Sequence, residues 1–423
     1  MTTYKQTELG LIPSDWEVVE LEQVANIDPE NLASNTALDY EFNYISLEQV
    51  TLGKLEKTEK YKFQDAPSRA RRILRKNDIL VSTVRPNLMS HYWVKNEISD
   101  LICSTGFSVV RTHDEKLVAS YFYHHLFANI INNQINLLVV GSNYPAINSK
   151  DVKRLKFSLP SKPEQTAIAT ALSDTDALLV ELEKLLAKKQ AIKTATMQQL
   201  LTGKTRLPEF AHYADGTPKG SLKTEWGDIP EDWEVKIIKN CCETFSGGTP
   251  STAIQEYYGG NIKWITSSDL NKGYIWNVEK TITEKGLNNS SAKKVSKNTL
   301  LLALYGATAG VVGITKIDAT INQAVLAIIP KYDNYLFLYY WFILHKNIIV
   351  ENYTQGGQAN LSGDIIRNIF LPMPPEPEQT AIAQILSDMD SEINALQARI
   401  EKVREIKQGM MQNLLTGKIR LPF

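Results

Sequence analysis

The most prominent functional side chains in this sequence are clusters of Lys and Arg, which suit contacts to phosphates. The densest run is SRARRILRK, and SSAKKVSK takes the corresponding place later in the chain. Local cations of this kind are what nucleic-acid phosphates require. A charged run is more often a solvated face, but its recurrence favours binding. The predicted phosphate contacts are Arg69, Arg71, Arg72, Arg75 and Lys76 in the first run and Lys293, Lys294 and Lys297 in the second.

Polar residues near β-rich turns are candidates for reading bases. Base edges are recognised by bidentate donors, such as Arg with guanine or Asn and Gln with adenine. Short polar side chains also stabilise turns, and that alternative stays open. The candidates are Ser82, Thr83, Arg85, Asn87, Ser142, Asn143 and Tyr144 in the first half, and Thr266, Ser267, Asp269, Asn322, Gln323, Gln355, Gln358 and Asn360 in the second.

Catalytic and metal-binding motifs are missing from the sequence. Gly203-Lys204-Thr205 resembles the end of a phosphate-binding loop, but Gln198 stands where its first glycine belongs. The histidines show no HExxH spacing, and no GxSxG elbow or NPPY-like tetrapeptide occurs. We therefore expect no catalytic residues, no metal site and no cofactor on this chain.

The charges are segregated within each half of the chain. Residues 6–53 contain ten acids and no Lys or Arg, whereas residues 54–111 contain twelve basic residues and six acids. Residues 224–262 hold seven acids and two lysines, whereas residues 263–298 hold seven lysines and three acids. A formal net charge of −1 therefore hides a basic region in each half.

The order of these regions repeats because the sequence itself is duplicated. Residues 7–18 recur as residues 224–235 with nine of twelve positions identical, and residues 163–208 recur as residues 377–422 with 25 of 46 identical. Each copy is a variable region followed by a strongly shared segment. This arrangement favours a folded pair with a pseudo-twofold axis over two halves that merely lie side by side.

Each shared segment predicts a long helix. Ser161 and Glu164 are spaced as a capping box, and Gly203 and Gly417 stand where a helix ends with a positive φ. Apolar residues at 3/4 spacing predict that the two helices pair as an antiparallel coiled coil. The alternative is that each helix packs only on its own domain. The expected pairing residues are Leu178, Leu182, Leu185 and Ile192 in the first helix and Leu386, Met389, Ile393, Leu396, Ile400 and Val403 in the second.

We therefore expect a mixed α/β (α+β) fold with two similar domains separated by two long helices. The variable regions contain short β-rich runs, and their aromatic stretches are long enough for buried helices. Residues 174–201 alone would form a rod of ~42 Å, close to the ~34–36 Å repeat of duplex DNA. The expected boundaries are 1–158 for the first domain, 159–208 for the first spacer helix, 209–223 for a connecting loop, 224–371 for the second domain and 372–423 for the second spacer helix.

The composition is that of a globular protein with a reducing environment. The 423 residues are 22% charged, and the three cysteines have no CxxC spacing. The first residues lack the layout of a signal peptide, and no apolar run approaches the length of a membrane span. We expect a cytoplasmic location without a membrane.

Two copies of PEQTAIA…LSD…LLTGK.RLP, each with a domain that opens with G.IP.DWEV, resemble the specificity (S) subunit of type I restriction–modification systems. The stretch from Ser246 to Leu270 looks like the opening of a target recognition domain of that family. The resemblance covers essentially the whole chain, but the recognition domains of the family diverge too widely to transfer base contacts.

The resemblance implies a protein without catalysis of its own. Each target recognition domain would read one half of an asymmetric, bipartite site in double-stranded DNA, and the paired helices would fix the spacer. The helices would also dock two modification subunits, which methylate adenine with S-adenosylmethionine, and restriction subunits that need ATP and Mg²⁺ would join them. The alternatives are a coiled-coil adaptor without DNA specificity and an enzyme with an unrecognised site.

Overall fold

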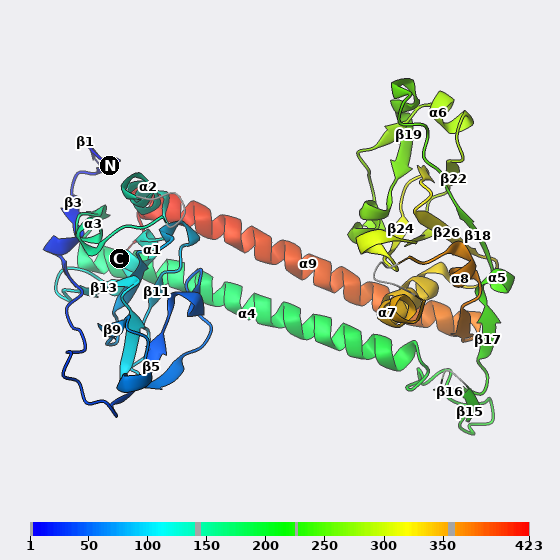
Figure 1. Cartoon of the computed structure of the whole chain (residues 1–423), viewed down its shortest axis with the longest axis horizontal. Helices are drawn as coiled ribbons and strands as arrows, with labels where there is room; N and C mark the ends of the chain where they lie inside the picture. The colour runs from blue at the N-terminus through cyan, green and yellow to red at the C-terminus, as the bar shows by residue number, and fades with distance from the viewer. Residues whose placement is uncertain (1–2, 140–144, 225–226, 354–359, 423) are drawn as a thin grey trace. The chain divides into compact units, whose positions relative to one another are not determined.

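The computed structural model describes residues 3–139, 145–224, 227–353 and 360–422. The chain divides into two compact units: unit 1 is Met1–Lys184 with Gln397–Phe423, and unit 2 is Leu185–Leu396. Two long helices, α4 (Lys162–Leu200) and α9 (Glu376–Leu414), each contribute one part to either unit (Figure 1). Among the described helices, none is both long and apolar enough to cross a bilayer.

Two four-stranded sheets form the centre of unit 1, with the orders β11-β10-β13-β4 and β8-β5-β12-β9. Most neighbours are antiparallel, whereas β5 and β12 run parallel. The strands are β4 (Ala25–Ile27), β5 (Glu41–Ile45), β8 (Glu59–Lys62), β9 (Ala70–Ile73), β10 (Ile79–Ser82), β11 (Tyr92–Trp93), β12 (Leu101–Ser104) and β13 (Phe107–Thr112).

Smaller strand pairs and short helices complete unit 1. The pairs are β1 (Tyr4–Thr7) with β2 (Gly10–Pro13), β3 (Glu17–Glu20) with β14 (Lys156–Leu159), and β6 (Val50–Thr51) with β7 (Lys54–Leu55). The helices are α1 (Ala119–His125), α2 (Asn129–Leu138), α3 (Ser149–Lys153) and the 3₁₀ turns η1 (Leu21–Gln23), η2 (Leu47–Gln49), η3 (Phe63–Asp65) and η4 (Pro86–Leu88). The aromatic stretch that predicts a buried helix forms α1, where Tyr121 and Phe122 are fully buried.

Unit 2 repeats this plan almost strand for strand. Its sheets have the orders β18-β26-β23-β24-β20 and β21-β19-β25-β22. The pair β19–β25 is parallel, as β5–β12 is in unit 1. The strands are β18 (Cys242–Ser246), β19 (Tyr258–Ile265), β20 (Tyr274–Ile275), β21 (Thr281–Ile282), β22 (Lys293–Val295), β23 (Leu300–Ala303), β24 (Val312–Thr315), β25 (Ala319–Ile321) and β26 (Val325–Pro330).

Most of the remaining elements of unit 2 also have counterparts in unit 1, whereas η5 has none. The strand pairs are β15 (Ser221–Thr224) with β16 (Gly227–Pro230) and β17 (Glu234–Ile237) with β27 (Phe370–Met373), so the expected connecting loop 209–223 ends inside β15. The helices are α5 (Ile238–Cys241), α6 (Glu284–Asn288), α7 (Tyr335–Tyr353), α8 (Gly363–Arg367) and the 3₁₀ turns η5 (Gln255–Tyr257), η6 (Ser267–Lys272) and η7 (Gly306–Thr308).

The long helices pair antiparallel in each unit. In unit 1, Lys407 of α9 forms an ion pair with Asp176 of α4, and in unit 2 the equivalent Lys193 of α4 forms one with Asp390 of α9. The pairing thus runs from the first part of one helix to the last part of the other. The fold class and the antiparallel coiled coil predicted from the sequence are confirmed, whereas the exact domain boundaries stay a prediction.

Three of the four residues predicted to pair α4 with α9 are exposed, so this part of the prediction was wrong. Leu178, Leu185 and Ile192 are 41–43% exposed, whereas Leu182 is buried as expected. The repeat offset of 214 relates Ile393, Ile400 and Val403 of α9 to Leu179, Leu186 and Lys189 of α4. The lysines explain the error: their aliphatic stems continue the seam while their ammonium groups bind acids of α9, such as Lys189 with Glu392 at 2.6 Å. In α9, Leu386, Ile393 and Ile400 are buried, and Met389, Leu396 and Val403 are half-buried.

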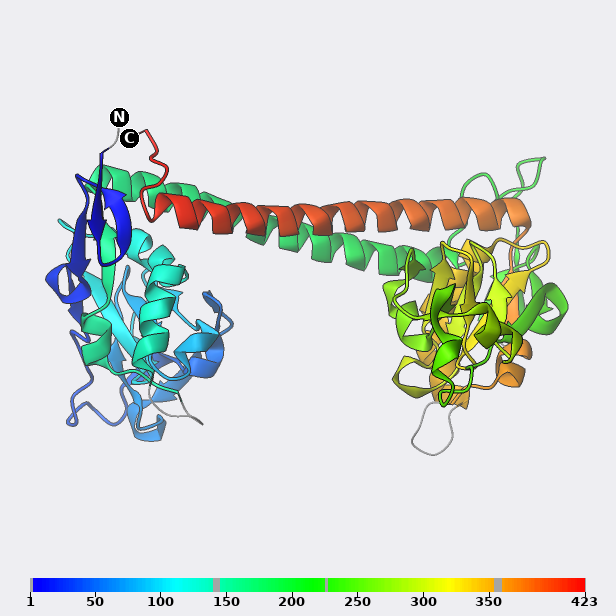
Figure 2. The ribbon, with the colours of Figure 1, turned by 90° about the horizontal axis from the view of Figure 1, so that it is seen from above.

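The end of each long helix packs into the core of a unit. Met411 and Leu414 of α9 and the following Leu415 belong to the core of unit 1, and the equivalent Met197, Leu200 and Leu201 belong to the core of unit 2. Gly203 and Gly417 then turn the chain with the predicted positive φ, +70° and +68°. After that turn the C-terminal segment lies beside the first hairpin, where Tyr4 Oη donates to the Gly417 carbonyl at 3.3 Å (Figure 2).

Candidate DNA interface

The basic run of unit 2 lies on β22, an edge strand of its sheet. Lys293 and Lys294 belong to this strand, Lys297 follows it, and all three are exposed. Within the described parts of the chain, the ammonium groups of these three lysines form no ion pair, whereas the Lys297 backbone N–H donates to the Asp318 carboxylate at 2.9 Å. Lys293 Nζ stands 5.2 Å above the Phe245 ring, which holds the ammonium without neutralising it.

Lys294 borders two hollows in this surface. One hollow, of about 420 Å³, is also lined by Asn261, Lys263, Ser296 and Asp318. The other, of about 490 Å³, includes Lys297 and Asn298 together with Asp333. Ammonium, amide and hydroxyl groups around a shallow depression provide the donors that phosphate oxygens accept.

The basic run of unit 1 lies on the equivalent edge strand, β9, but its surroundings differ. Arg72 forms an ion pair with Asp28, and both side chains are only 14% exposed. Arg75 pairs with Glu30 at 2.6 Å, and the Arg71 guanidinium stacks 4.8 Å from the Phe63 ring. Arg69 and Lys76 are exposed. The prediction for Arg72 is therefore corrected, because Asp28 neutralises its charge inside unit 1.

A buried acid extends this network in unit 1. Asp78 accepts hydrogen bonds from Arg111 Nε at 2.8 Å and Nη2 at 2.7 Å, and these bonds raise the pKa of the Arg111 guanidinium. Arg111 also reaches Glu30 at 2.9 Å. Three guanidinium groups and three carboxylates thus compensate one another beside β9.

The base-reading candidates of unit 1 divide into buried and exposed residues. Ser82 and Thr83 are buried, and their hydroxyls donate to the carbonyls of Val84 (2.9 Å) and Gly106 (2.7 Å). These two predictions are corrected, because the hydroxyls stabilise the strand end as polar turn residues do. Arg85 and Asn87 are exposed around η4, and Arg85 has a positive φ of 50°. Ser142, Asn143 and Tyr144 lie outside the described residues.

In unit 2 the candidates gather around one turn. Thr266 is buried, and its N–H and hydroxyl both donate to the Asp269 carboxylate, at 3.0 and 2.9 Å. Thr266 is therefore corrected to a capping residue of η6, whereas Ser267 is half-exposed beside it. Asn322 joins the same place, because its N–H donates to the Ile265 carbonyl at 3.1 Å. Asn360 is exposed, and Gln355 and Gln358 lie outside the described residues.

Two glycines of the SGGTPST segment, Gly247 and Gly248, allow its backbone to pass close to the sheet beside this turn. A Cβ on Gly247 would lie 1.8 Å from the Ile321 carbonyl oxygen, and one on Gly248 would lie 2.1 Å from Ser291 Oγ. The backbone therefore passes directly over the sheet, and the Thr249 hydroxyl reaches the exposed Gln323 side chain. Thr249 was missed from the sequence, although its adjacent glycines indicated a close backbone approach.

Each unit also contains a clamp that the sequence did not reveal. In unit 1, Glu164 at the start of α4 accepts from Arg420 Nε (2.7 Å), from Arg420 Nη2 (2.6 Å) and from Trp16 Nε1 (3.0 Å). Arg420 also donates to both carboxylate oxygens of Asp15, at 3.0 and 2.9 Å, and these bonds lower the pKa of Asp15. Glu164 is therefore the centre of a clamp and not the expected capping residue.

Unit 2 repeats this clamp residue for residue. Glu378 accepts from Arg206 Nε (2.6 Å), from Arg206 Nη2 (2.7 Å) and from Trp233 Nε1 (3.2 Å). Arg206 Nη1 and Nη2 donate to Asp232 at 2.8 and 3.1 Å. The repeated sequence blocks supplied the signal for this clamp, because G.IP.DWEV, PEQ and GK.RLP contribute its four members in each copy.

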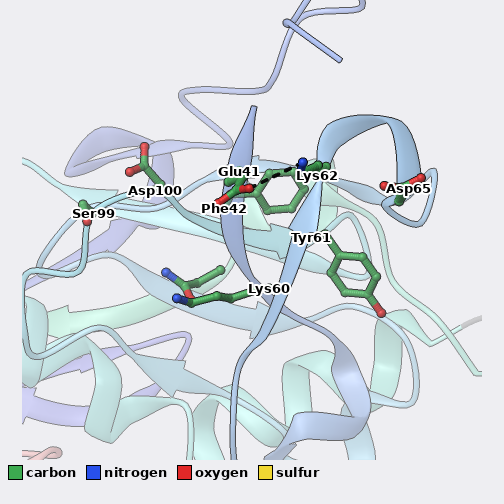
Figure 3. A pocket seen from close by; sticks show the side chains of 9 residues that line it. Glu41, Phe42, Lys60, Tyr61, Lys62, Asp65, Ser99 and Asp100 are labelled. Carbon is green, nitrogen blue, oxygen red and sulfur yellow. Dashed lines mark ion pairs between the residues drawn. The ribbon is translucent and has the colours of Figure 1, made fainter. Parts of the chain in front are cut away.

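A further hollow in unit 1 lies at the opposite edge of the β9 sheet, against β5 and β8. It measures about 570 Å³. Figure 3 shows the ion pair between Glu41 of β5 and Lys62 of β8, which lie opposite each other on neighbouring strands. Its acids and lysines are exposed and nearly balanced, which is not an arrangement for acid–base catalysis. Among the described residues, no cluster of His, Cys, Asp or Glu could hold a metal ion.

Comparisons with known proteins agree with this architecture. The family described as "Type I restriction modification DNA specificity domain" matches residues 13–194 and 230–405. A putative type I restriction enzyme specificity subunit, MjaX, from Methanocaldococcus jannaschii is 28% identical over 437 aligned residues, which cover 99% of this chain and 97% of that protein.

Solved structures share the fold. The HsdS subunit from Thermoanaerobacter tengcongensis matches with a TM-score of 0.52 and 21% identity, over 96% of this chain and 98% of that one. The S subunit of the type I restriction–modification system from M. genitalium matches with a TM-score of 0.58 and 15% identity, over 94% and 96%. With the family match over both halves, the chain belongs to the specificity subunits of type I restriction–modification systems.

Proposed function

We propose that this chain is the non-catalytic, cytoplasmic DNA-reading subunit of its restriction–modification complex. Each recognition domain reads one half of a bipartite, asymmetric site in double-stranded DNA, and α4 and α9 set the spacer between the halves. The observation that carries the proposal is the duplicated unit, in which the same sheets and the same clamp recur with different surface residues. Equivalent scaffolds with divergent surfaces suit two readers with different specificities.

The partners of the complex supply its chemistry. The paired helices dock two modification subunits, which use S-adenosylmethionine to methylate adenine, and restriction subunits that use ATP and Mg²⁺ join this core. The exposed Leu178, Leu185 and Ile192 of α4 support the docking role, because apolar residues at heptad spacing suit a partner helix.

Footprinting of the complex with its modification subunits tests the reading of a bipartite site. Two short protected tracts about one helical turn apart are expected. One continuous tract, or none, would contradict the proposal. Exchange of residues 1–158 for another recognition domain should then change only one of the two tracts.

The spacer role can be tested by lengthening both helices together. The ion pairs Lys189–Glu392 and Lys193–Asp390 place Leu186 opposite residues 395 and 396. One heptad inserted after Leu186 and another after Ala395 should keep the pairing and add ~10 Å, or about three base pairs of spacer. An unchanged spacer would reject the role of the helices as a ruler.

A further inference from the structure

Trp276 of unit 2 is exposed in a way that no other described tryptophan is. Its side chain is 68% accessible, whereas Trp16, Trp233, Trp264 and Trp341 are at most 7% accessible. A large aromatic side chain left in water loses the stabilisation that burial would give. Single exposed aromatic residues are common on protein surfaces, so the surroundings of Trp276 carry the argument.

The backbone around Trp276 is held firmly. Ile275 before it is fully buried, and Val278 after it is 1% exposed. The Lys316 N–H donates to the Ile275 carbonyl at 2.9 Å, and Lys263 Nζ donates to the Val278 carbonyl at 3.2 Å. The indole therefore stands on a fixed support and is presented to solvent by the fold.

This support adjoins the turn that carries the base-reading candidates. Lys272 Nζ donates to the Asn277 carbonyl and to Asp269 Oδ1, both at 3.2 Å, so one ammonium group joins the Trp276 segment to η6. Strand β20, which precedes Trp276, also packs against η6. The Trp276 segment thus adjoins η6, which begins at the half-exposed Ser267.

The charges around Trp276 are mixed, with cations in the majority. Lys272, Glu279 and Lys280 are exposed near Trp276 in the sequence, the Lys272 ammonium is paired with Asp269, and Lys316 stands 5.1 Å above the Tyr274 ring. An aromatic face bordered by ammonium groups suits nucleic acid, since the cations meet phosphates and the ring meets bases.

We propose that Trp276 packs its indole against the bases at one step of the half-site that unit 2 reads. This inference rests on the proposed function and deepens it, because it assigns one apolar contact within the base stack to a named residue. Apolar side chains placed between base steps partly unstack them, and the deformation depends on the DNA sequence. Trp276 would therefore contribute to specificity as well as to affinity.

The test uses the complex with modification subunits and a duplex that contains the footprinted site. The variant Trp276→Ala should bind this duplex about tenfold more weakly, and Trp276→Phe should stay within about threefold of wild type. The matched control is Tyr332→Ala, which removes another exposed aromatic side chain, 88% accessible, from the same unit. Tyr332→Ala should bind like wild type.

A spectroscopic readout locates the contact. With 2-aminopurine placed at successive positions of the half-site, fluorescence should rise at one step with wild type and not with Trp276→Ala. Equal affinity and equal fluorescence for wild type and Trp276→Ala would overturn the inference. It would also be overturned if Trp276→Ala weakened assembly with the modification subunits while assembled complexes bound DNA normally. A wild-type complex that binds no bipartite duplex would instead refute the proposed function itself, and this inference with it.

Discussion

The edge strands β9 and β22 hold equivalent places in the two units, yet their cations meet different neighbours. In unit 1 the segment after β4 carries Asp28 and Glu30, which pair with Arg72 and Arg75. In unit 2 the residues that directly follow β18 are Gly247, Gly248 and Thr249, none of which is acidic. The ammonium groups of the β22 lysines therefore form no ion pair within the described protein, although Asp318 lies beside them.

Whether a basic run can bind phosphates therefore depends on the acids in the segment that packs beside it. Pre-paired guanidinium groups stabilise unit 1 and release few counterions on binding DNA. Exposed ammonium groups without an ion-pair partner cost little free energy of folding, and they can contact phosphates directly. We therefore expect the first run to act mainly on stability and the second mainly on affinity.

The largest expected effect is a loss of stability at low pH. This loss should be greater in unit 1 than in unit 2. Burial lowers the pKa of His91 to about 4 and the pKa values of His124 and His125 to about 3, and all three lie in unit 1. Unfolded histidine titrates near pH 6.5, so the unfolded state takes up these protons first as the pH falls. Stability is fully present above about pH 6.5 and declines towards pH 4, by on the order of 3 kcal/mol per ring.

Hydrogen exchange between pH 7 and pH 4 measures this decline for each unit separately. Core amides of unit 1 should lose protection before those of unit 2. His125→Phe should weaken the pH dependence, because both ring nitrogens of His125 lack hydrogen-bond partners in the described structure. Equal loss of protection in both units would show that these rings do not control acid stability.

The two clamps provide an internal control, since they are alike in both units. Arg420→Ala and Arg206→Ala should each destabilise their own unit by about 3–5 kcal/mol, because each leaves a glutamate that is 1% exposed without its cation. Chemical denaturation followed by hydrogen exchange reports both values. The double variant Glu164→Gln with Arg420→Met should recover part of the loss, and a much smaller effect in one unit would contradict the equivalence.

The edge strands should respond unequally to the same substitution. Arg72→Met should destabilise unit 1 by about 2–3 kcal/mol, because it leaves the largely buried Asp28 carboxylate without its cation, with only hydrogen bonds from Val109 N–H and the Ser108 and Ser149 hydroxyls. Lys294→Met should change the stability of unit 2 by less than about 0.5 kcal/mol, because Lys294 is exposed. Similar losses in both units would remove the distinction between a structural and a binding cluster.

The sequence predicted the duplication, the long helices and their antiparallel pairing, because these features depend on repeated blocks and on apolar periodicity. It misplaced the α4 stripe because Lys189 and Lys193 occupy seam positions that apolar spacing alone does not count. It could not distinguish Arg72 from Lys294, because the acid that neutralises Arg72 lies 44 positions away in the chain. The buried Ser82 and Thr266 show the same limit, since local polarity does not indicate which side of a strand faces the core.

The dependence of DNA binding on salt measures whether the β22 lysines contact phosphates. In the complex with modification subunits, the combined variant Lys293→Gln, Lys294→Gln and Lys297→Gln should reduce the slope of log K against log salt. The expected reduction is about 0.9 for each phosphate that the variant no longer neutralises, or ~2.7 for all three lysines. The charge-matched control replaces Lys223, Lys239 and Lys331 by glutamine and should leave the slope unchanged. A slope equal to that of wild type in the β22 variant would contradict the account.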